Sequence, residues 1–227
     1  DARKLSNGVR AGIEEVADVA EPAALTARLA DLGKAGRSVL VDPELTPEAH
    51  LRAIEEAGGR LVEAQDPVLA AKAVKTAAEI SGTRAAHHRD GVALVRFLKW
   101  LEDKADAGGF GEIEAVTALE RFRAETGALK EISFDTISGA GEHGAIVHYR
   151  VTNRTDRRAM PGELFLIDSG GQYADGTTDV TRTVPVGVPS DEMKVRFTQV
   201  LKGHIAIATA RFPAGTSGAQ IDALARI

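Results

Sequence analysis

The pattern of apolar and polar residues over the first 66 positions alternates between helical and strand periods. Apolar residues at helical spacing predict helices over 23–32 and 46–57, and short β-branched runs predict strands over 38–41 and 61–64. Alternating helices and strands are typical of α/β folds. Two strands do not make a stable sheet alone, so we expect partner strands from a preceding segment.

The pattern changes beyond the break at Asp66-Pro67. One long helical tract is predicted over 68–106, and a second helix over 113–125. From 132 to 186 the apolar period falls from 3.6 to 2, which predicts strands joined by Gly-rich turns. A helix over 191–211 follows, closed by proline and glycine.

We therefore place a domain boundary near residue 67, with one part over 1–66 and the other over 67–227. Both ends of the chain look cut. No methionine precedes Asp1, and an apolar-periodic helix predicted over 217–227 has no stop signal. We expect the chain to be a fragment of a longer protein.

Composition narrows the class of protein. Apolar residues make up 44% and charged residues 27%, which excludes collagen-like and largely disordered chains. The net charge of −5 and the 4% of aromatic residues provide neither a basic surface nor stacking rings, so no nucleic acid or membrane partner is expected. No apolar run reaches the roughly 18 residues that span a bilayer, and we expect a cytoplasmic protein.

Two motifs look like nucleotide-binding sequences but lack the required context. Residues 139–144, Gly-Ala-Gly-Glu-His-Gly, have the spacing of a dinucleotide-binding loop, but β-branched residues over 145–151 follow them instead of a helix. We expect a strand at 133–137, a turn at the glycines and a second strand at 145–151. The triplet His88-Arg89-Asp90 is similar to a kinase motif but lies inside a predicted helix, without the asparagine that such a motif needs.

The segment between Asp168 and Asp179 carries the most informative pattern. An apolar strand runs into Asp168, glycines and the pair Asp175-Gly176 turn the chain, and a second strand starts at Asp179, 11 positions after Asp168. Across a hairpin this offset can bring two carboxylates together, which is unfavourable unless a divalent cation neutralises them or they share a proton. The alternative is a different register, in which two turn-forming aspartates never meet. Asp175 directly precedes a glycine and is the better turn residue.

A metal site in this chain would use oxygen and imidazole ligands, because the chain has no cysteine. Two aspartates favour Mn²⁺, with Mg²⁺, Co²⁺ and Zn²⁺ as alternatives, and further His or Glu ligands are needed to complete the shell. His148 lies in the strand predicted at 145–151. A lone histidine in a strand is more often structural than catalytic, so the residues themselves leave its role open.

Four stretches of the sequence together match a pattern found in a known protein family. They are Ala86-His87-His88-Arg89-Asp90-Gly91, Ser133-Phe134-Asp135-Thr136-Ile137, Ala145-Ile146-Val147-His148-Tyr149 and the run from Leu166 to Thr183. This set resembles the Xaa-Pro aminopeptidases (aminopeptidase P) of the pita-bread metallopeptidase family. The resemblance covers 67–227 and implies an α/β (α+β) chain, in which the end of a creatinase-N-like middle domain over 1–66 precedes the first half of a pita-bread catalytic domain.

The resemblance also implies roles for individual residues. Asp168 and Asp179 match the first two metal ligands, with Asp179 bridging two ions, and His148 matches the histidine that assists proton transfer near the scissile bond. The remaining ligands, one His and two Glu, would lie beyond residue 227. Many relatives carry Pro-Asn where this chain has Glu142-His143, and that difference puts only local substrate contacts in doubt.

The implied reaction is hydrolysis of the N-terminal Xaa-Pro peptide bond by water activated at two divalent ions. Mn²⁺ is the expected metal, with Zn²⁺ or Co²⁺ as alternatives; the substrates are peptides with proline at the second position, and the enzyme is expected to be a homodimer. The fragment alone is expected to be inactive. Two other functions stay open: a prolidase-like or creatinase-like hydrolase, and a catalytically dead binding module, which would have no reason to keep two close carboxylates.

Overall fold

The computed structural model describes residues 4–226. The chain divides into two compact units after Lys75, so residues 67–75, which follow the predicted break at Asp66-Pro67, group with the first unit. Within the described residues, no helix combines the length and the apolar character that a membrane span requires.

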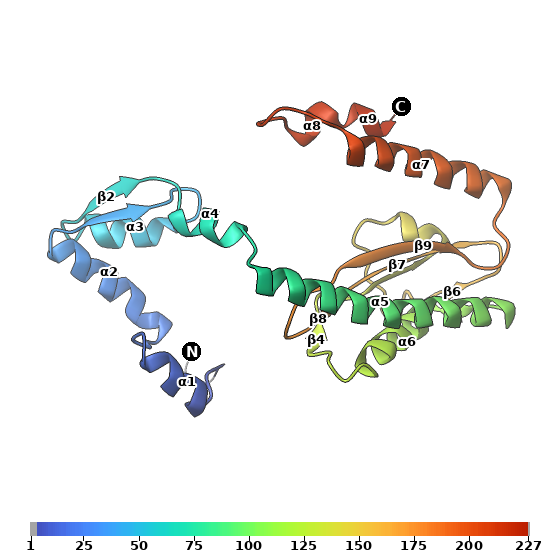
Figure 1. Ribbon diagram of the computed structural model, residues 1–227, viewed down its shortest axis with the longest axis horizontal. Helices are drawn as coiled ribbons and strands as arrows, with labels where there is room; N and C mark the ends of the chain where they lie inside the picture. The colour runs from blue at the N-terminus through green and yellow to red at the C-terminus, as the bar shows by residue number, and fades with distance from the viewer. Residues whose placement is uncertain (1–3, 227) are drawn as a thin grey trace. The chain divides into compact units, whose positions relative to one another are not determined.

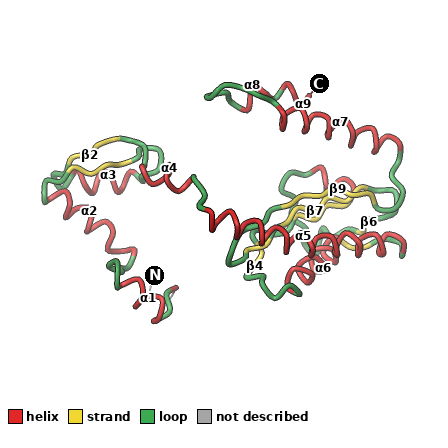
Figure 2. The backbone as a smooth tube through the Cα atoms, in the orientation of Figure 1, coloured by secondary structure: helices red, strands yellow, loops and turns green. Residues whose placement is uncertain are grey.

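The first unit is a small α/β arrangement (Figure 2). Strands β1 and β2 pair in parallel, with Ser38 opposite Arg60, and helix α3 connects them. Helix α2 packs on α3 at Gly33, where a side chain would collide with the carbonyl oxygen of Ile54. The predicted alternation of helices and strands is confirmed. The elements are α1 (Asn7–Glu14), η2 (Pro22–Ala24), α2 (Leu25–Lys34), β1 (Ser38–Val41), α3 (Glu48–Glu55), β2 (Arg60–Glu63) and α4 (Pro67–Ala73).

The helical tract predicted over 68–106 is wrong in one respect, because the structure forms two helices there. α4 ends at Ala73, and α5 (Ala77–Asp106) begins after Thr76. Thr76 and Glu79 form a capping box: the Thr76 hydroxyl accepts a hydrogen bond from the Glu79 amide, and the Glu79 carboxylate accepts one from the Thr76 amide. This helix start signal interrupts an otherwise continuous helical pattern.

The second unit is built around an antiparallel sheet with β7 between β5 and β9. Strands β7 and β9 are labelled in Figure 1. The shorter strands pair as β3 with β6 and β4 with β8. The predicted helices over 113–125 and 191–211 are confirmed as α6 and α7. The remaining elements of this unit are β3 (Phe110–Gly111), α6 (Glu112–Ala124), β4 (Glu131–Ile132), β5 (Ile137–Ala140), η3 (Gly141–Ala145), β6 (Arg158–Ala159), β7 (Leu164–Ser169), β8 (Gly171–Gln172), β9 (Val180–Pro185), α7 (Asp191–Thr209), α8 (Gly218–Ile221) and α9 (Ala223–Arg226).

The core of the second unit is shared by α5, α6 and the sheet. The apolar face of α5, the long green helix in Figure 1, buries Leu94, Phe97 and Leu101, as their spacing predicts. Phe110 of β3 and Phe165 of β7 meet edge to face, with ring centroids 4.9 Å apart. This packing holds β7 in the middle of the unit. It therefore also holds in place the residues at the end of β7.

Two strand predictions in this unit are wrong. The strand expected at 133–137 begins only at Ile137 and forms β5. Residues 145–151 form no strand: Ala145 ends the 3-10 helix η3, and the Tyr149 amide donates to the Ile146 carbonyl at 3.2 Å, which closes a turn. β-branched residues favour a strand only where a neighbouring strand pairs with them, and none does so here within the described residues.

The helix predicted over 217–227 is also interrupted. It forms two short helices, α8 and α9, on either side of Asp222, and its last residue, Ile227, lies outside the described residues. α9 packs on α7 at Gly203, where a side chain would collide with the Ala225 backbone.

Candidate metal centre

One cavity of about 300 Å³ collects all three residues that the sequence singles out. They lie in three different places: Asp168 near the end of β7, Asp179 directly before β9, and His148 in the turn after η3. The cavity is lined by Phe134, Asp135, Ile137, His148, Arg150, Asp168 and Asp179.

Asp168 is held by the central strand of the sheet. It pairs with Ile137 of β5 on one side and with Thr181 of β9 on the other. Its side chain is half-buried, and Oδ1 is buried without a hydrogen-bond partner among the described residues. A buried carboxylate oxygen that lacks a partner is unfavourable by roughly 1–3 kcal/mol or more, so this atom is suited to a ligand.

Asp179 lies next to Asp168 on the same face of the sheet. Asp168 is opposite Thr181, and Asp179 lies two residues before Thr181, directly ahead of β9, so the alternation of side chains puts it on the same side as Thr181. The register of β7 and β9 and the shared cavity therefore argue against the alternative in which the two aspartates stay apart. Asp179 is exposed, and both carboxylates face the cavity.

Asp175 points elsewhere, as expected of a turn residue. Its carboxylate accepts two hydrogen bonds from the Arg89 guanidinium of α5, at 3.1 and 2.9 Å. The Arg89 hydrogen bonds lower the pKa of Asp175. This acidic residue is consequently engaged outside the cavity, and Asp168 and Asp179 remain as the candidate ligands.

His148 reaches the cavity from a strained turn and not from the strand predicted for it. Its φ of 55° is in the left-handed region, which is uncommon outside glycine and asparagine. The side chain is exposed and lines the cavity with the two aspartates. Arg150, two residues further on, forms an exposed ion pair with Asp135 at the same cavity.

A buried glutamate supports this turn, and sequence reasoning missed it. Glu112, fully buried at the start of α6, accepts hydrogen bonds through Oε1 from the Ala140 amide at 2.8 Å and through Oε2 from the Arg157 amide at 3.1 Å. Its Oε1 also lies 2.7 Å from His143 Nδ1, and the His143 ring lies against the Tyr149 ring with centroids 4.3 Å apart. His143 is therefore part of the support for the turn, whereas Glu142 is exposed.

Sequence reasoning also missed a second buried carboxylate. Asp90 of α5 accepts hydrogen bonds from Arg123 and Tyr173. Burial raises the pKa of Asp90, but these hydrogen bonds outweigh burial and leave the pKa below its usual value. Burial and the neighbouring Asp90 raise the pKa of Tyr173. A signal existed in the sequence, because Asp90 precedes Leu94 by four residues and so falls on the apolar face of the helix.

The residues present fit a divalent cation but do not complete its shell. Two carboxylates line one cavity, and one of them has an oxygen that no donor among residues 4–226 satisfies, so they form a hard-oxygen donor set. Within the described residues, no group of three or more His, Cys, Asp or Glu side chains is arranged to hold a metal ion. Further ligands are needed from outside this set.

Comparisons with known proteins agree with this chemistry. The model of metallopeptidase family M24 matches residues 81–227. A probable Xaa-Pro aminopeptidase P of Laccaria bicolor is 48% identical over 163 residues, which are 71% of this chain and 25% of the relative. Aminopeptidase P2 of Arabidopsis thaliana is 45% identical over 163 residues, 71% of this chain and 23% of the relative.

Among solved structures, an X-prolyl aminopeptidase from Caenorhabditis elegans, described as a cytosolic enzyme with a dinuclear active site, matches with a TM-score of 0.87 and 36% identity. The match covers 100% of this chain and 38% of that protein. The mixed α/β fold of this chain thus matches that of a solved aminopeptidase. The chain spans about a quarter of the length of the curated relatives it matches.

Proposed function

The chain belongs to metallopeptidase family M24, and from this membership we propose that the protein carrying it is an Xaa-Pro aminopeptidase that uses two divalent metal ions. Its substrates are peptides with proline at the second position, and the bond hydrolysed is the one that precedes this proline. The names of the relatives and the dinuclear site of the C. elegans enzyme support the proposal. The observation in this chain that carries it is the convergence of Asp168, Asp179 and His148 on one cavity.

Asp168 and Asp179 are the residues that would hold the metal, and Oδ1 of Asp168 accepts no hydrogen bond from the described residues. An all-oxygen pair suits Mn²⁺, with Zn²⁺ or Co²⁺ as alternatives. Two bound divalent cations supply Lewis acidity and a water that is nucleophilic at neutral pH. His148 would donate a hydrogen bond from an imidazole N–H to the scissile carbonyl oxygen, where negative charge develops.

The wider assignment follows the same family. Residues 1–66 are the C-terminal part of a middle α/β domain, and 67–227 are the N-terminal part of a pita-bread catalytic domain. A homodimer and a cytosolic location complete the proposal; the location is supported by the description of the C. elegans enzyme. Sedimentation of the full-length protein tests the dimer.

The decisive experiment removes the metal and each candidate ligand in turn. The full-length protein is treated with a chelator and assayed on a tripeptide with proline at position two, before and after Mn²⁺ is added. We expect activity to disappear and return. Asp168→Asn and Asp179→Asn should each prevent the return and reduce the metal content measured by elemental analysis.

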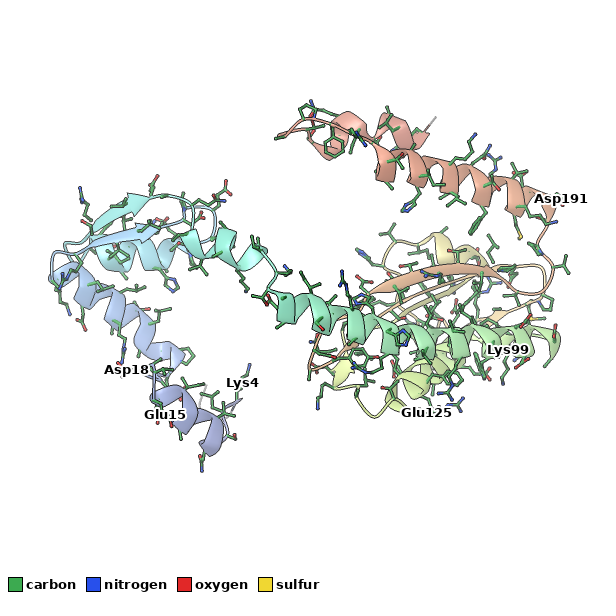
Figure 3. The ribbon with its side chains drawn as sticks, in the orientation of Figure 1. Lys4, Glu15, Asp18, Lys99, Glu125 and Asp191 are labelled. Carbon is green, nitrogen blue, oxygen red and sulfur yellow. The ribbon has the colours of Figure 1, made fainter. Side chains whose placement is uncertain are left out.

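A matched control removes the same charge away from the cavity. Asp191, labelled in Figure 3 at the first turn of α7, has a side chain that is 99% exposed. Asp191→Asn should retain metal and activity. If Asp168→Asn and Asp179→Asn behaved like this control, the two aspartates would not be ligands. Hydrolysis of dipeptides only would favour a prolidase, and a protein without bound metal or activity would favour a binding module.

A further inference from the structure

The hydrogen-bonded group formed by Asp90, Arg123 and Tyr173 has no part in the chemistry described so far. The Arg123 guanidinium donates to both carboxylate oxygens of Asp90, at 2.8 and 3.1 Å, and the Tyr173 hydroxyl donates to Asp90 Oδ1 at 2.7 Å. The side chains of Arg123 and Asp90 are 0% and 3% exposed. Asp90 belongs to α5, Arg123 to α6, and Tyr173 to the hairpin between the candidate ligands.

This arrangement is not what stability alone would favour. A buried ion pair loses much of its attraction to desolvation, and apolar residues of similar volume are often at least as stable. Arg123 Nη1 is also buried without a hydrogen-bond partner among the described residues. What the group provides is a defined geometry. Each hydrogen bond fixes the position of a donor atom relative to its acceptor, which apolar packing does not do.

These hydrogen bonds fix the position of the hairpin that joins Asp168 to Asp179. Tyr173 belongs to this hairpin, and its amide donates to the Gly176 carbonyl at 2.9 Å, which closes the turn. The Arg89–Asp175 ion pair joins the tip of the hairpin to α5. Gly82 of α5 has no side chain where one would collide with the Asp175 carbonyl oxygen, so helix and hairpin backbones touch.

The fixed region ends one residue before Asp179. Thr178 is 1% exposed and is hydrogen-bonded to the backbone of Gly171. The Thr178 amide donates to the Gly171 carbonyl at 2.9 Å, and the Thr178 hydroxyl accepts a hydrogen bond from the Gly171 amide at 2.9 Å. The Ser133 hydroxyl donates to the Thr178 carbonyl at 3.1 Å. The backbone that carries Asp179 is thus held from both sides.

We propose that Asp90, Arg123 and Tyr173 are positioning residues that hold Asp179 at the separation from Asp168 needed to bind metal tightly. The inference rests on the proposed function, because it assigns these residues to the same metal site. Asp168 needs no such support, since the sheet holds it on both sides. Asp179 precedes its strand and depends on the hairpin.

The test measures Mn²⁺ binding to the metal-free, full-length protein by calorimetry, at a temperature where every variant is folded. Tyr173→Phe removes one hydroxyl and leaves the ring packing in place. We expect its dissociation constant for Mn²⁺ to rise about tenfold, the size of effect seen when residues that orient metal ligands are changed. Asp90→Asn should raise it further, because it weakens the bonds to Arg123 as well.

Two controls separate positioning from stability. Tyr149→Phe removes the chain's other tyrosine hydroxyl, whose bond to the Thr155 carbonyl is long at 3.4 Å, and should bind Mn²⁺ like wild type. Leu119→Ala, at a fully buried position of α6, should lower the unfolding temperature without changing the Mn²⁺ affinity of the folded protein. If Tyr173→Phe matched Leu119→Ala, with lower stability and unchanged affinity, the inference would be overturned and the proposed function would stand. Absence of Mn²⁺ binding by the wild type would overturn both.

Discussion

The strained backbone at His148 leads to a prediction in which stability and activity change in opposite directions. His148→Gly removes an exposed side chain from a residue with φ of 55°. Left-handed backbone is unfavourable by roughly 1–2 kcal/mol for a residue with a Cβ, and glycine has no such penalty. Glycine also gains roughly 0.4–1 kcal/mol of freedom in the unfolded chain, which opposes folding. The net expectation is a free energy of unfolding that rises by roughly 0–1.5 kcal/mol.

Urea denaturation of the full-length protein measures this change, and hydrolysis of an Xaa-Pro peptide measures activity. The matched control is Val147→Gly, at a neighbouring position that is 83% exposed and lies outside the left-handed region. This variant has no strain to relieve and should lose roughly 0.4–1 kcal/mol. His148→Gly should be the more stable of the two and should lose activity. A His148→Gly protein as destabilised as Val147→Gly would refute the strain argument, and one that remained fully active would refute the role of the imidazole.

Two further predictions concern the support of the hairpin. Gly82→Ala should reduce the free energy of unfolding by roughly 1–3 kcal/mol, because its Cβ would collide with the Asp175 backbone; Gly91→Ala, on the same helix with open space around it, is the control for thermal denaturation. Asp90 has a lowered pKa in the folded state, so it contributes stability that is present above the unfolded pKa near 3.8 and is lost as the pH falls through the folded pKa. Asp90→Asn should therefore be less stable at pH 7 and less sensitive to acid, as measured by urea midpoints from about pH 7 down to about pH 2; an unchanged acid dependence would contradict this.

The two aspartates show what local sequence can predict. Their offset of 11 residues, the apolar strand before Asp168 and the Asp175-Gly176 turn predict a hairpin that can bring both carboxylates together, and the antiparallel register of β7 and β9 puts them on one face. These are short-range features, encoded within a single stretch of chain. Helices α2 and α3 and strands β1 and β2 of the first unit were predictable for the same reason, since each follows from the local period and its flanking turn residues, whereas α1 was not predicted.

The conformation around His148 shows what local sequence does not determine. Its β-branched neighbours favour a strand, but the turn is held by contacts with distant residues, of which Glu112 lies 31 positions before His143. The bond between Tyr173 and Asp90 spans 83 positions. A charged residue on an apolar helix face signals that some buried partner exists, yet the partner's identity depends on how helix and hairpin pack.

The candidate site therefore combines two kinds of support with different sensitivities. Asp168 is positioned by backbone pairing on both sides of β7, and backbone pairing changes little when a single side chain is replaced. Asp179 and His148 lie outside the strands. Their positions depend on the buried Asp90 and Tyr173 at the hairpin, and on the buried Glu112 and the partly buried His143 near the turn. Substitutions far from the cavity should thus act mainly through Asp179 and His148. The two buried carboxylates that contact these segments, Asp90 and Glu112, lie on α5 and α6, the two helices packed in the core of this unit.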